Sequence, residues 1–130
     1  MAIQWKDVYK VGNPEIDQQH QELFGRANAF LVATDKATKT ECAMGLFQYT
    51  REHFSYEEGV MRELNYPAMT GHIQQHNDLI ERLNGIAANI ASGELAHKDL
   101  ESFLADWLLG HIRIFDTKLA AYISGKKLVT

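Results

Sequence analysis

Four stretches of this chain repeat their apolar residues at intervals of three and four, and this periodicity constrains the fold more than any other feature. Such spacing gathers apolar side chains on one face of an α-helix, and the strict alternation expected of strands is absent. Helices are expected over about residues 16–34, from the Thr38 region to about residue 64, and over about 68–91 and 97–124. Because the links are short, neighbouring helices should run antiparallel, which predicts an all-α, up-down-up-down four-helix bundle with an N-terminal arm.

The expected helix ends carry residues that commonly start and stop helices. Asn13 and Pro14 suit the cap and first turn of the first helix, and Thr38 and Thr40 offer caps for the second. The stop signals follow the second, third and fourth helices: Pro67, Ser92-Gly93 and Gly125. One domain is therefore expected over residues 1–130, with an extended arm over 1–15 packed on a bundle over 16–125.

Composition excludes several classes of partner. Thirteen basic against seventeen acidic residues give a formal charge of −4, which leaves no basic surface for nucleic acid. No stretch approaches the roughly 18 apolar residues of a membrane span, and the N-terminus lacks the apolar core of a signal peptide, so a cytoplasmic protein is expected. The single Cys42 falls in a helical pattern where cysteine is usually a small buried hydrophobe.

Five of the six histidines fall on the stripes that should face the bundle interior: His20, His53, His72, His76 and His111. Glu57 follows His53 by four residues and His76 follows His72 by four, so each pair projects from one helical face. In an antiparallel bundle these positions lie near one end, within one polar layer. Four helices are thus expected to contribute to one site.

In the fourth helix Asp116 follows His111 by five residues. Positions five apart in a regular α-helix diverge by roughly 140°, so these two side chains would not converge unaided. We therefore expect a π-bulge between them, a feature often found at functional sites.

Burying five imidazoles with two carboxylates and no cation would cost several kcal/mol, and a metal centre removes that cost. The nearest basic residues lie off these stripes, so internal salt bridges are a poor substitute. Imidazole suits zinc, copper, iron or nickel. Seven donors are too many for one ion and too few to saturate two octahedral ions, unless carboxylates bridge and solvent oxygen completes the shells.

Four segments together resemble the ligand motifs of hemerythrins, particularly bacterial single-domain ones, in the right order and over nearly the whole chain: residues 17–20 (DQQH), 53–58 (HFSYEE), 72–76 (HIQQH) and 111–116 (HIRIFD). The resemblance implies two non-haem irons, ferrous or ferric, that share an oxo or hydroxo bridge. It assigns His72, His76 and His111 to one iron and His20 and His53 to the other, with Glu57 and Asp116 bridging both.

The implied ligand count leaves one coordination position free on the second iron, where dioxygen would bind end-on as a hydroperoxide. An apolar pocket should limit loss of peroxide. Six residues one helical step from the ligands are expected to line it: Leu23, Phe24, Phe54, Trp107, Leu108 and Ile112.

The leading functional hypothesis is a dioxygen carrier, store or supplier, not an enzyme, that passes oxygen to an oxygen-consuming protein and is monomeric. The chief alternative is a di-iron oxidase or peroxidase, or a nitric-oxide-processing protein. Oxygen-activating di-iron bundles typically use more carboxylates, so five imidazoles with two carboxylates favour reversible binding. A sensory module is a third class, but it normally needs an attached output domain.

Overall fold

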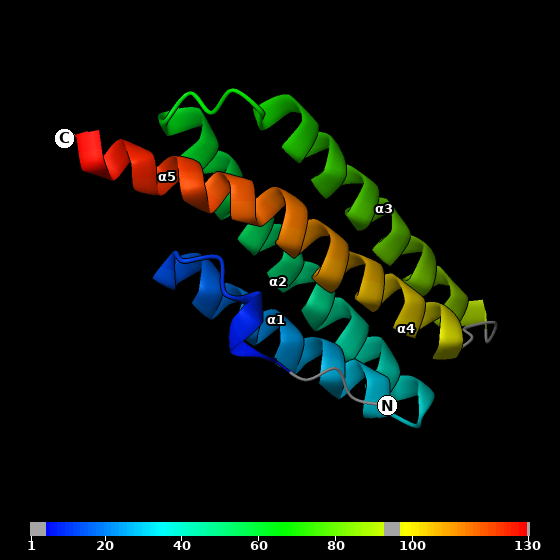
Figure 1. The fold of residues 1–130 in the computed structure, drawn as a ribbon. Coiled ribbons are helices and arrows are strands. Elements are labelled where there is room, and N and C mark those ends of the chain that lie inside the picture. Colours follow the sequence, from blue (N-terminus) through cyan, green and yellow to red (C-terminus); the bar gives the residue numbers. More distant parts are fainter. Residues whose placement is uncertain (1–4, 93–96, 130) are drawn as a thin grey trace.

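The computed structural model describes residues 5–92 and 97–129, and the side chains at 91–100, 108–109 and 126–129 lie outside that description. The helices of the described residues form four rods in an antiparallel bundle (Figure 1). In chain order they are α1 (Pro14–Val32), α2 (Lys36–Glu63), α3 (Met69–Ser92) and a fourth rod made of α4 (His97–Ala105), the π-helix η2 (Asp106–Asp116) and α5 (Thr117–Val129). No strand occurs in the described ranges, and the predicted all-α four-helix bundle is confirmed. None of the described helices is long and apolar enough to cross a membrane.

The start of α1 is fixed as the sequence predicts. The Asn13 side chain caps the helix by accepting a hydrogen bond of 3.1 Å from the backbone N–H of Ile16. The Asp17 carboxylate then accepts hydrogen bonds from the backbone N–H groups of Val11, at 2.7 Å, and of Gly12, at 3.3 Å. Gly12 has a φ of +96°, a conformation that glycine adopts without steric cost. These contacts set the direction in which the chain enters the bundle.

The caps predicted for α2 are wrong. The helix begins at Lys36, and its cap is Asp35, whose carboxylate accepts a hydrogen bond of 3.0 Å from the backbone N–H of Thr38. Thr40 lies within the first turns and donates its hydroxyl to the Lys36 carbonyl. Asp35 caps the helix in place of Thr38 and Thr40 because it stands immediately before the first helical residue. From there its carboxylate reaches the unpaired backbone N–H groups of the first turn.

Two predicted stop signals also need correction. Helix α2 ends before Pro67, because Asn65 takes a left-handed φ of +52° and the Tyr66 N–H bonds back to the Met61 carbonyl at 2.9 Å. Gly125 does not end the last helix, since α5 continues to Val129 and Gly125 has no positive φ. The described part of α3 extends to Ser92, and Gly93 of the predicted stop lies outside the described residues.

The N-terminal arm packs on α1 but is not fully extended. Residues Asp7–Tyr9 form one 3-10 turn, η1, which leaves Val8 75% exposed. The rings of Trp5 and Tyr9 contact Phe24, with centroid separations of 5.1 and 5.7 Å. The arm therefore covers the α1 face that carries Phe24.

Buried apolar residues form two clusters, one on each side of a polar layer. The larger cluster extends toward the α1–α2 connection and includes Leu23, Phe30, Leu46, Leu83, Leu104 and Ile112. The smaller cluster consists of Ile16, Met61, Tyr66, Leu119 and Ile123. On α1, for example, His20 lies between Ile16 of one cluster and Leu23 of the other. The polar layer is thus closed by packed side chains along the bundle axis.

Candidate metal centre

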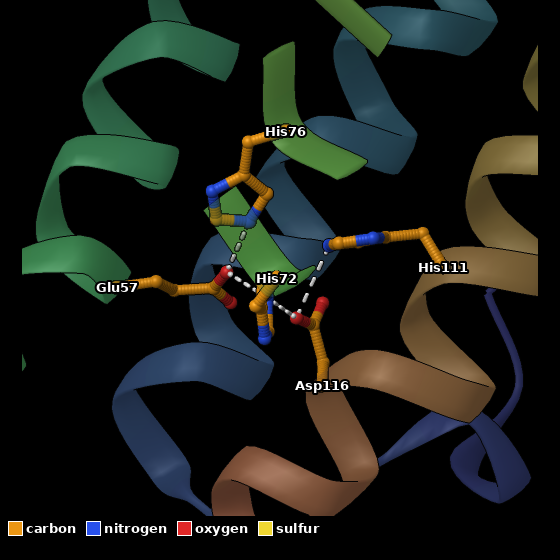
Figure 2. A group of neighbouring side chains, drawn as sticks. All are labelled: Glu57, His72, His76, His111 and Asp116. Atoms are coloured by element: carbon orange, nitrogen blue, oxygen red, sulfur yellow. Dashed lines mark hydrogen bonds and ion pairs between the residues drawn. The ribbon is translucent and has the colours of Figure 1, made fainter. Parts of the chain in front are cut away.

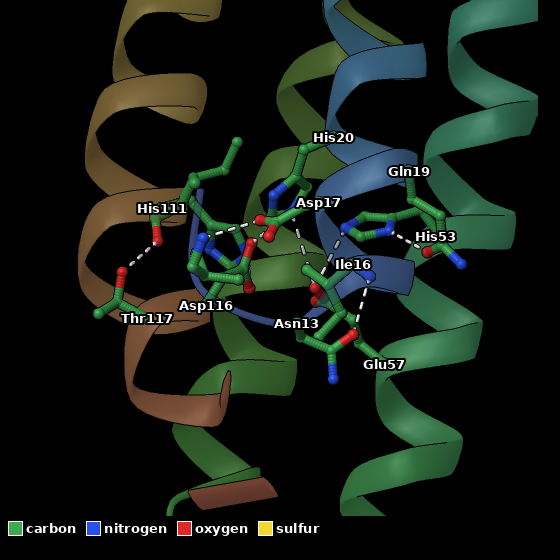
Figure 3. A network of polar contacts seen from close by, with 12 residues as sticks. Asn13, Ile16, Asp17, Gln19, His20, His53, Glu57, His111, Asp116 and Thr117 are labelled. Carbon is green, nitrogen blue, oxygen red and sulfur yellow. Dashed lines mark hydrogen bonds and ion pairs between the residues drawn. The ribbon is translucent and has the colours of Figure 1, made fainter. Parts of the chain in front are cut away.

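The polar layer brings together all seven side chains that the sequence singles out. His20 comes from α1, His53 and Glu57 from α2, His72 and His76 from α3, and His111 and Asp116 from η2 (Figures 2 and 3). Each of the seven is at most 2% exposed. All four rods therefore supply donors to one buried site, at the common depth that an antiparallel topology predicts.

Glu57 lies among four of the imidazoles, and each of them turns its Nε2 atom toward the carboxylate. The distances from Glu57 oxygens to Nε2 are 3.0 Å for His76, 3.1 Å for His53, 3.4 Å for His72 and 3.8 Å for His20. One carboxylate on α2 is thus within reach of histidines from three rods.

Asp116 occupies the corresponding place on the fourth rod. Its oxygens lie 2.9 Å from Nε2 of His20, 3.1 Å from that of His72 and 3.3 Å from that of His111. The family resemblance divides the histidines into one half with His72, His76 and His111 and another with His20 and His53. Glu57 and Asp116 each face histidines of both halves, so both carboxylates can link the two halves.

The π-helix explains how His111 and Asp116 converge. Hydrogen bonds in η2 run over one residue more than in an α-helix, so one turn closes over more residues and positions five apart come onto the same side. At its end both the backbone N–H and, at 3.3 Å, the hydroxyl of Thr117 donate to the Ile112 carbonyl. The predicted π-helical distortion between His111 and Asp116 is confirmed, although it extends over a longer segment.

The cluster is close-packed but poorly hydrogen-bonded. His20 Nε2 and Asp116 Oδ2 are 2.9 Å apart, yet neither atom has a hydrogen-bond partner of suitable alignment. The same holds for Nε2 of His72 and His111, and for Glu57 Oε2. Buried polar groups are rarely left in this way, because each orphaned group costs about 1–3 kcal/mol. A cation shared by these converging donor atoms would satisfy them.

The donor atoms form two overlapping groups in which all atoms lie within 4.8 Å of one another. One group contains Glu57, His72, His76, His111 and Asp116, and the other contains His20, His53, Glu57 and Asp116. The two carboxylates belong to both groups. The donor set fits two adjacent cations better than one.

Electrostatics within the cluster favour charged groups despite burial. Burial acts to raise the pKa of Glu57 and of Asp116, but the surrounding histidines hold both pKa values well below the ordinary range. Burial acts to lower the pKa of His53 and of His72, yet the two carboxylates raise both, and that of His72 reaches about 9. Without a metal, protonated imidazoles thus balance the carboxylates. A metal ion would displace these protons, because a ligating imidazole must be neutral.

Two histidines have outer hydrogen-bond partners that the sequence analysis did not identify. The Gln19 amide oxygen lies 2.6 Å from His53 Nδ1, and a Glu58 oxygen lies 2.9 Å from His76 Nδ1. Both partners are sequence neighbours of proposed ligands, which is the only signal that the sequence carries. Such partners fix the ring orientation and leave Nε2 facing the cluster.

Aromatic and aliphatic side chains surround the imidazoles. Five of the six residues predicted to line a pocket are buried in the larger apolar cluster: Leu23, Phe24, Phe54, Trp107 and Ile112. The side chain of the sixth, Leu108, lies outside the described residues. Phe54 stacks on His76 with ring centroids 3.8 Å apart. Phe115, which was not among the predicted pocket residues, stacks on His111 with ring centroids 5.4 Å apart.

Comparison with known proteins gives consistent matches. A family model described as hemerythrin HHE cation binding domain matches residues 11–123, which include all seven cluster residues. The chain is 32% identical over 112 residues to a bacteriohemerythrin of Stenotrophomonas maltophilia and 30% identical over 112 residues to one of Pseudomonas aeruginosa, covering 84% of this chain and 73% of each relative. It is 27% identical over 114 residues to a myohemerythrin of Sipunculus nudus, covering 88% of both chains.

Proposed function

The chain belongs to the hemerythrin family, and from this premise we propose that its buried cluster holds two non-haem irons at which dioxygen binds reversibly. Hemerythrins bind non-haem iron, and they are oxygen-binding carriers and not enzymes. The observation that carries the proposal is the set of buried, converging donor atoms, several of which have no hydrogen-bond partner.

The two groups of donor atoms suggest how the irons would be held. His72, His76 and His111 would bind one ion, His20 and His53 the other, and Glu57 and Asp116 would bridge both. Three histidines against two make the halves unequal, which supports an open position for dioxygen on the two-histidine side. Two irons bound there, sharing an oxo or hydroxo bridge, would supply ferrous–ferric chemistry, in which dioxygen accepts two electrons on binding and returns them on release.

The protein's own contribution is to position the ligands and to exclude water. Nε2 atoms face the cluster because the rings are wedged between helices and, at His53 and His76, hydrogen-bonded on the far side. The stacked ring of Phe54 and the buried Trp107 and Ile112 keep the surroundings apolar. An apolar, enclosed site disfavours charge separation and hydrolysis, and so supports reversible binding over permanent oxidation.

The protein would act as a monomeric cytoplasmic carrier or store whose recipient is an oxygen-consuming protein. The formal charge of −4 supports a diffusing carrier over one bound to nucleic acid.

Reconstitution tests the proposal. The metal-free chain is loaded with ferrous iron under anaerobic conditions, the iron per chain is counted, and the visible spectrum is followed on admission of air and on purging with argon. We expect two irons per chain and a charge-transfer absorption that appears in air and disappears under argon. Permanent oxidation in the first cycle, or a single iron per chain, would contradict the proposal.

A matched pair of variants on α1 locates the reaction. His20→Ala removes a ligand from the two-histidine half and should abolish the reversible absorption and lower the iron content. Gln21→Ala changes the adjacent, exposed residue and should leave both unchanged. An unchanged spectrum and iron content in His20→Ala would remove this residue from the site.

A further inference from the structure

Within the described side chains, the outer hydrogen bonds divide unevenly between the halves of the cluster. Only His53 and His76, of the five cluster histidines, have an Nδ1 atom with a hydrogen-bond partner, whereas Nδ1 of His20, His72 and His111 has none. His53 belongs to the two-histidine group and His76 to the three-histidine group. Each proposed ion therefore has one imidazole with an outer partner.

The two partners differ in charge. Gln19, on α1, offers a neutral amide oxygen 2.6 Å from His53 Nδ1, as Figure 3 shows. Glu58, on α2, offers a carboxylate oxygen 2.9 Å from His76 Nδ1. The two contacts are otherwise alike, since each comes from a neighbouring helix and accepts from the ring atom that faces away from the cluster.

The surroundings of Glu58 hold its carboxylate in place. Its side chain is 19% exposed, and while one oxygen faces His76, the other lies 3.7 Å from Nη2 of Arg62. Arg62 is 64% exposed, so water screens its charge more than that of Glu58. A net negative charge thus remains close to the His76 ring.

We propose that these outer partners make the two halves electronically unequal, with Glu58 stabilising the ferric ion on the three-histidine side and Gln19 orienting His53 without adding charge. The inference rests on the proposed di-iron site. A carboxylate that accepts from Nδ1–H makes the imidazole a stronger donor, and stronger donation favours the higher oxidation state. An amide fixes the ring to a similar degree but adds no charge. Glu58 and Gln19 are accordingly positioning residues, because they act through the histidines.

In the half-oxidised protein this asymmetry decides which ion is ferric. Ferricyanide takes one electron from the fully ferrous centre and becomes ferrocyanide, and no bond in the protein is broken. The Nδ1 proton of His76 stays between the ring and Glu58. The ion held by His72, His76 and His111 should therefore be oxidised first, and the ion held by His20 and His53 should remain ferrous.

The test removes the negative charge at Glu58 and, in a second variant, adds one at Gln19. For each iron-loaded protein the first one-electron midpoint potential is measured under argon, and Mössbauer spectra are recorded of the half-oxidised form. Glu58→Gln should raise the potential by about 59 mV, which corresponds to a tenfold loss in ferric-over-ferrous affinity. Gln19→Glu should lower the potential and shift ferric character toward the two-histidine ion. Glu52→Gln is the control, because it removes the same charge from an exposed position on α2 beside His53 and should change the potential far less.

The outcomes are distinct. Equal shifts in Glu58→Gln and Glu52→Gln, or no shift in Glu58→Gln with two irons still bound, would overturn the inference. If Glu58→Gln fails to fold or to load iron, Gln19→Glu decides alone, and an unchanged or raised potential in that variant would overturn it. Because no oxygen is used, failure of reversible oxygen binding in the wild type would contradict the proposed function and leave this measurement intact.

Discussion

Deleting Ile114 should convert the π-helix η2 into regular α-helix and still leave a complete metal site. Ile114 lies between His111 and Asp116, is 60% exposed and is not a ligand. Without it the two ligands are four positions apart, so a regular helix brings them to within roughly 40° of one face, against roughly 140° for a spacing of five. Without the extra residue the segment no longer needs the wider π-helical turn, so it should form a regular α-helix in which Asp116 stays beside His111.

The expected magnitude follows from the residues beyond the deletion. Leu119 and Ile123, at 0% and 6% exposure, belong to the smaller apolar cluster. If the rod absorbs the deletion, both stay buried and stability changes little. If it does not, everything after the deletion rotates by about 100°. Exposing these two side chains would then cost about 3–6 kcal/mol, at about 1.5–3 kcal/mol each.

The assay compares urea unfolding and iron content for two deletions on the same rod. Deletion of Lys118, an exposed residue in the regular helix α5, is the control, since nothing there can absorb the loss and Leu119 must turn away from the core. We expect the chain without Ile114 to bind two irons and to unfold near the wild-type midpoint, and the chain without Lys118 to lose several kcal/mol. Equal damage from the two deletions would refute the view that η2 contains a surplus residue.

Three further predictions concern pH, packing and capping. The pKa values of His53 and His72 are raised in the folded state, so protonation of these imidazoles stabilises the metal-free fold below the unfolded-state pKa of about 6.5. Chemical denaturation should therefore show the free energy of unfolding falling as pH rises from about 6.5 toward 9. A constant or rising free energy of unfolding over that range would contradict the charge balance inferred for the cluster. Ile112→Ala should lower unfolding free energy by about 2–5 kcal/mol and hasten permanent oxidation of the loaded protein, and an unchanged oxidation rate would argue against a water-excluding role. Asn13→Ala should cost about 1 kcal/mol of unfolding free energy through loss of the α1 cap, with iron content unchanged.

The sequence by itself determined the helices, their order and the depth of the cluster. Each of these depends on local spacing: a period near 3.6 marks a helical face, and short links force antiparallel neighbours, so residues near alternate helix ends must meet. The five-residue interval between His111 and Asp116 even indicated the π-helical distortion, because two ligands that must converge exclude a regular helix between them. Family membership followed from the order of the motifs and is confirmed.

The sequence identified Asn13 as the cap of α1, but it identified neither Asp35 as the cap of α2 nor the side chains that support the ligands. Asp35, and not Thr38 or Thr40, caps α2, and α2 ends at the left-handed Asn65 before it reaches Pro67. Neighbouring polar side chains compete for the same backbone groups, and the differences in free energy between the alternatives are small. Gln19 reaches a histidine 34 residues away, and Glu58 one 18 residues away. Such contacts depend on the rotation of one helix against another, which packing of the whole core sets, and only the tertiary structure decides it.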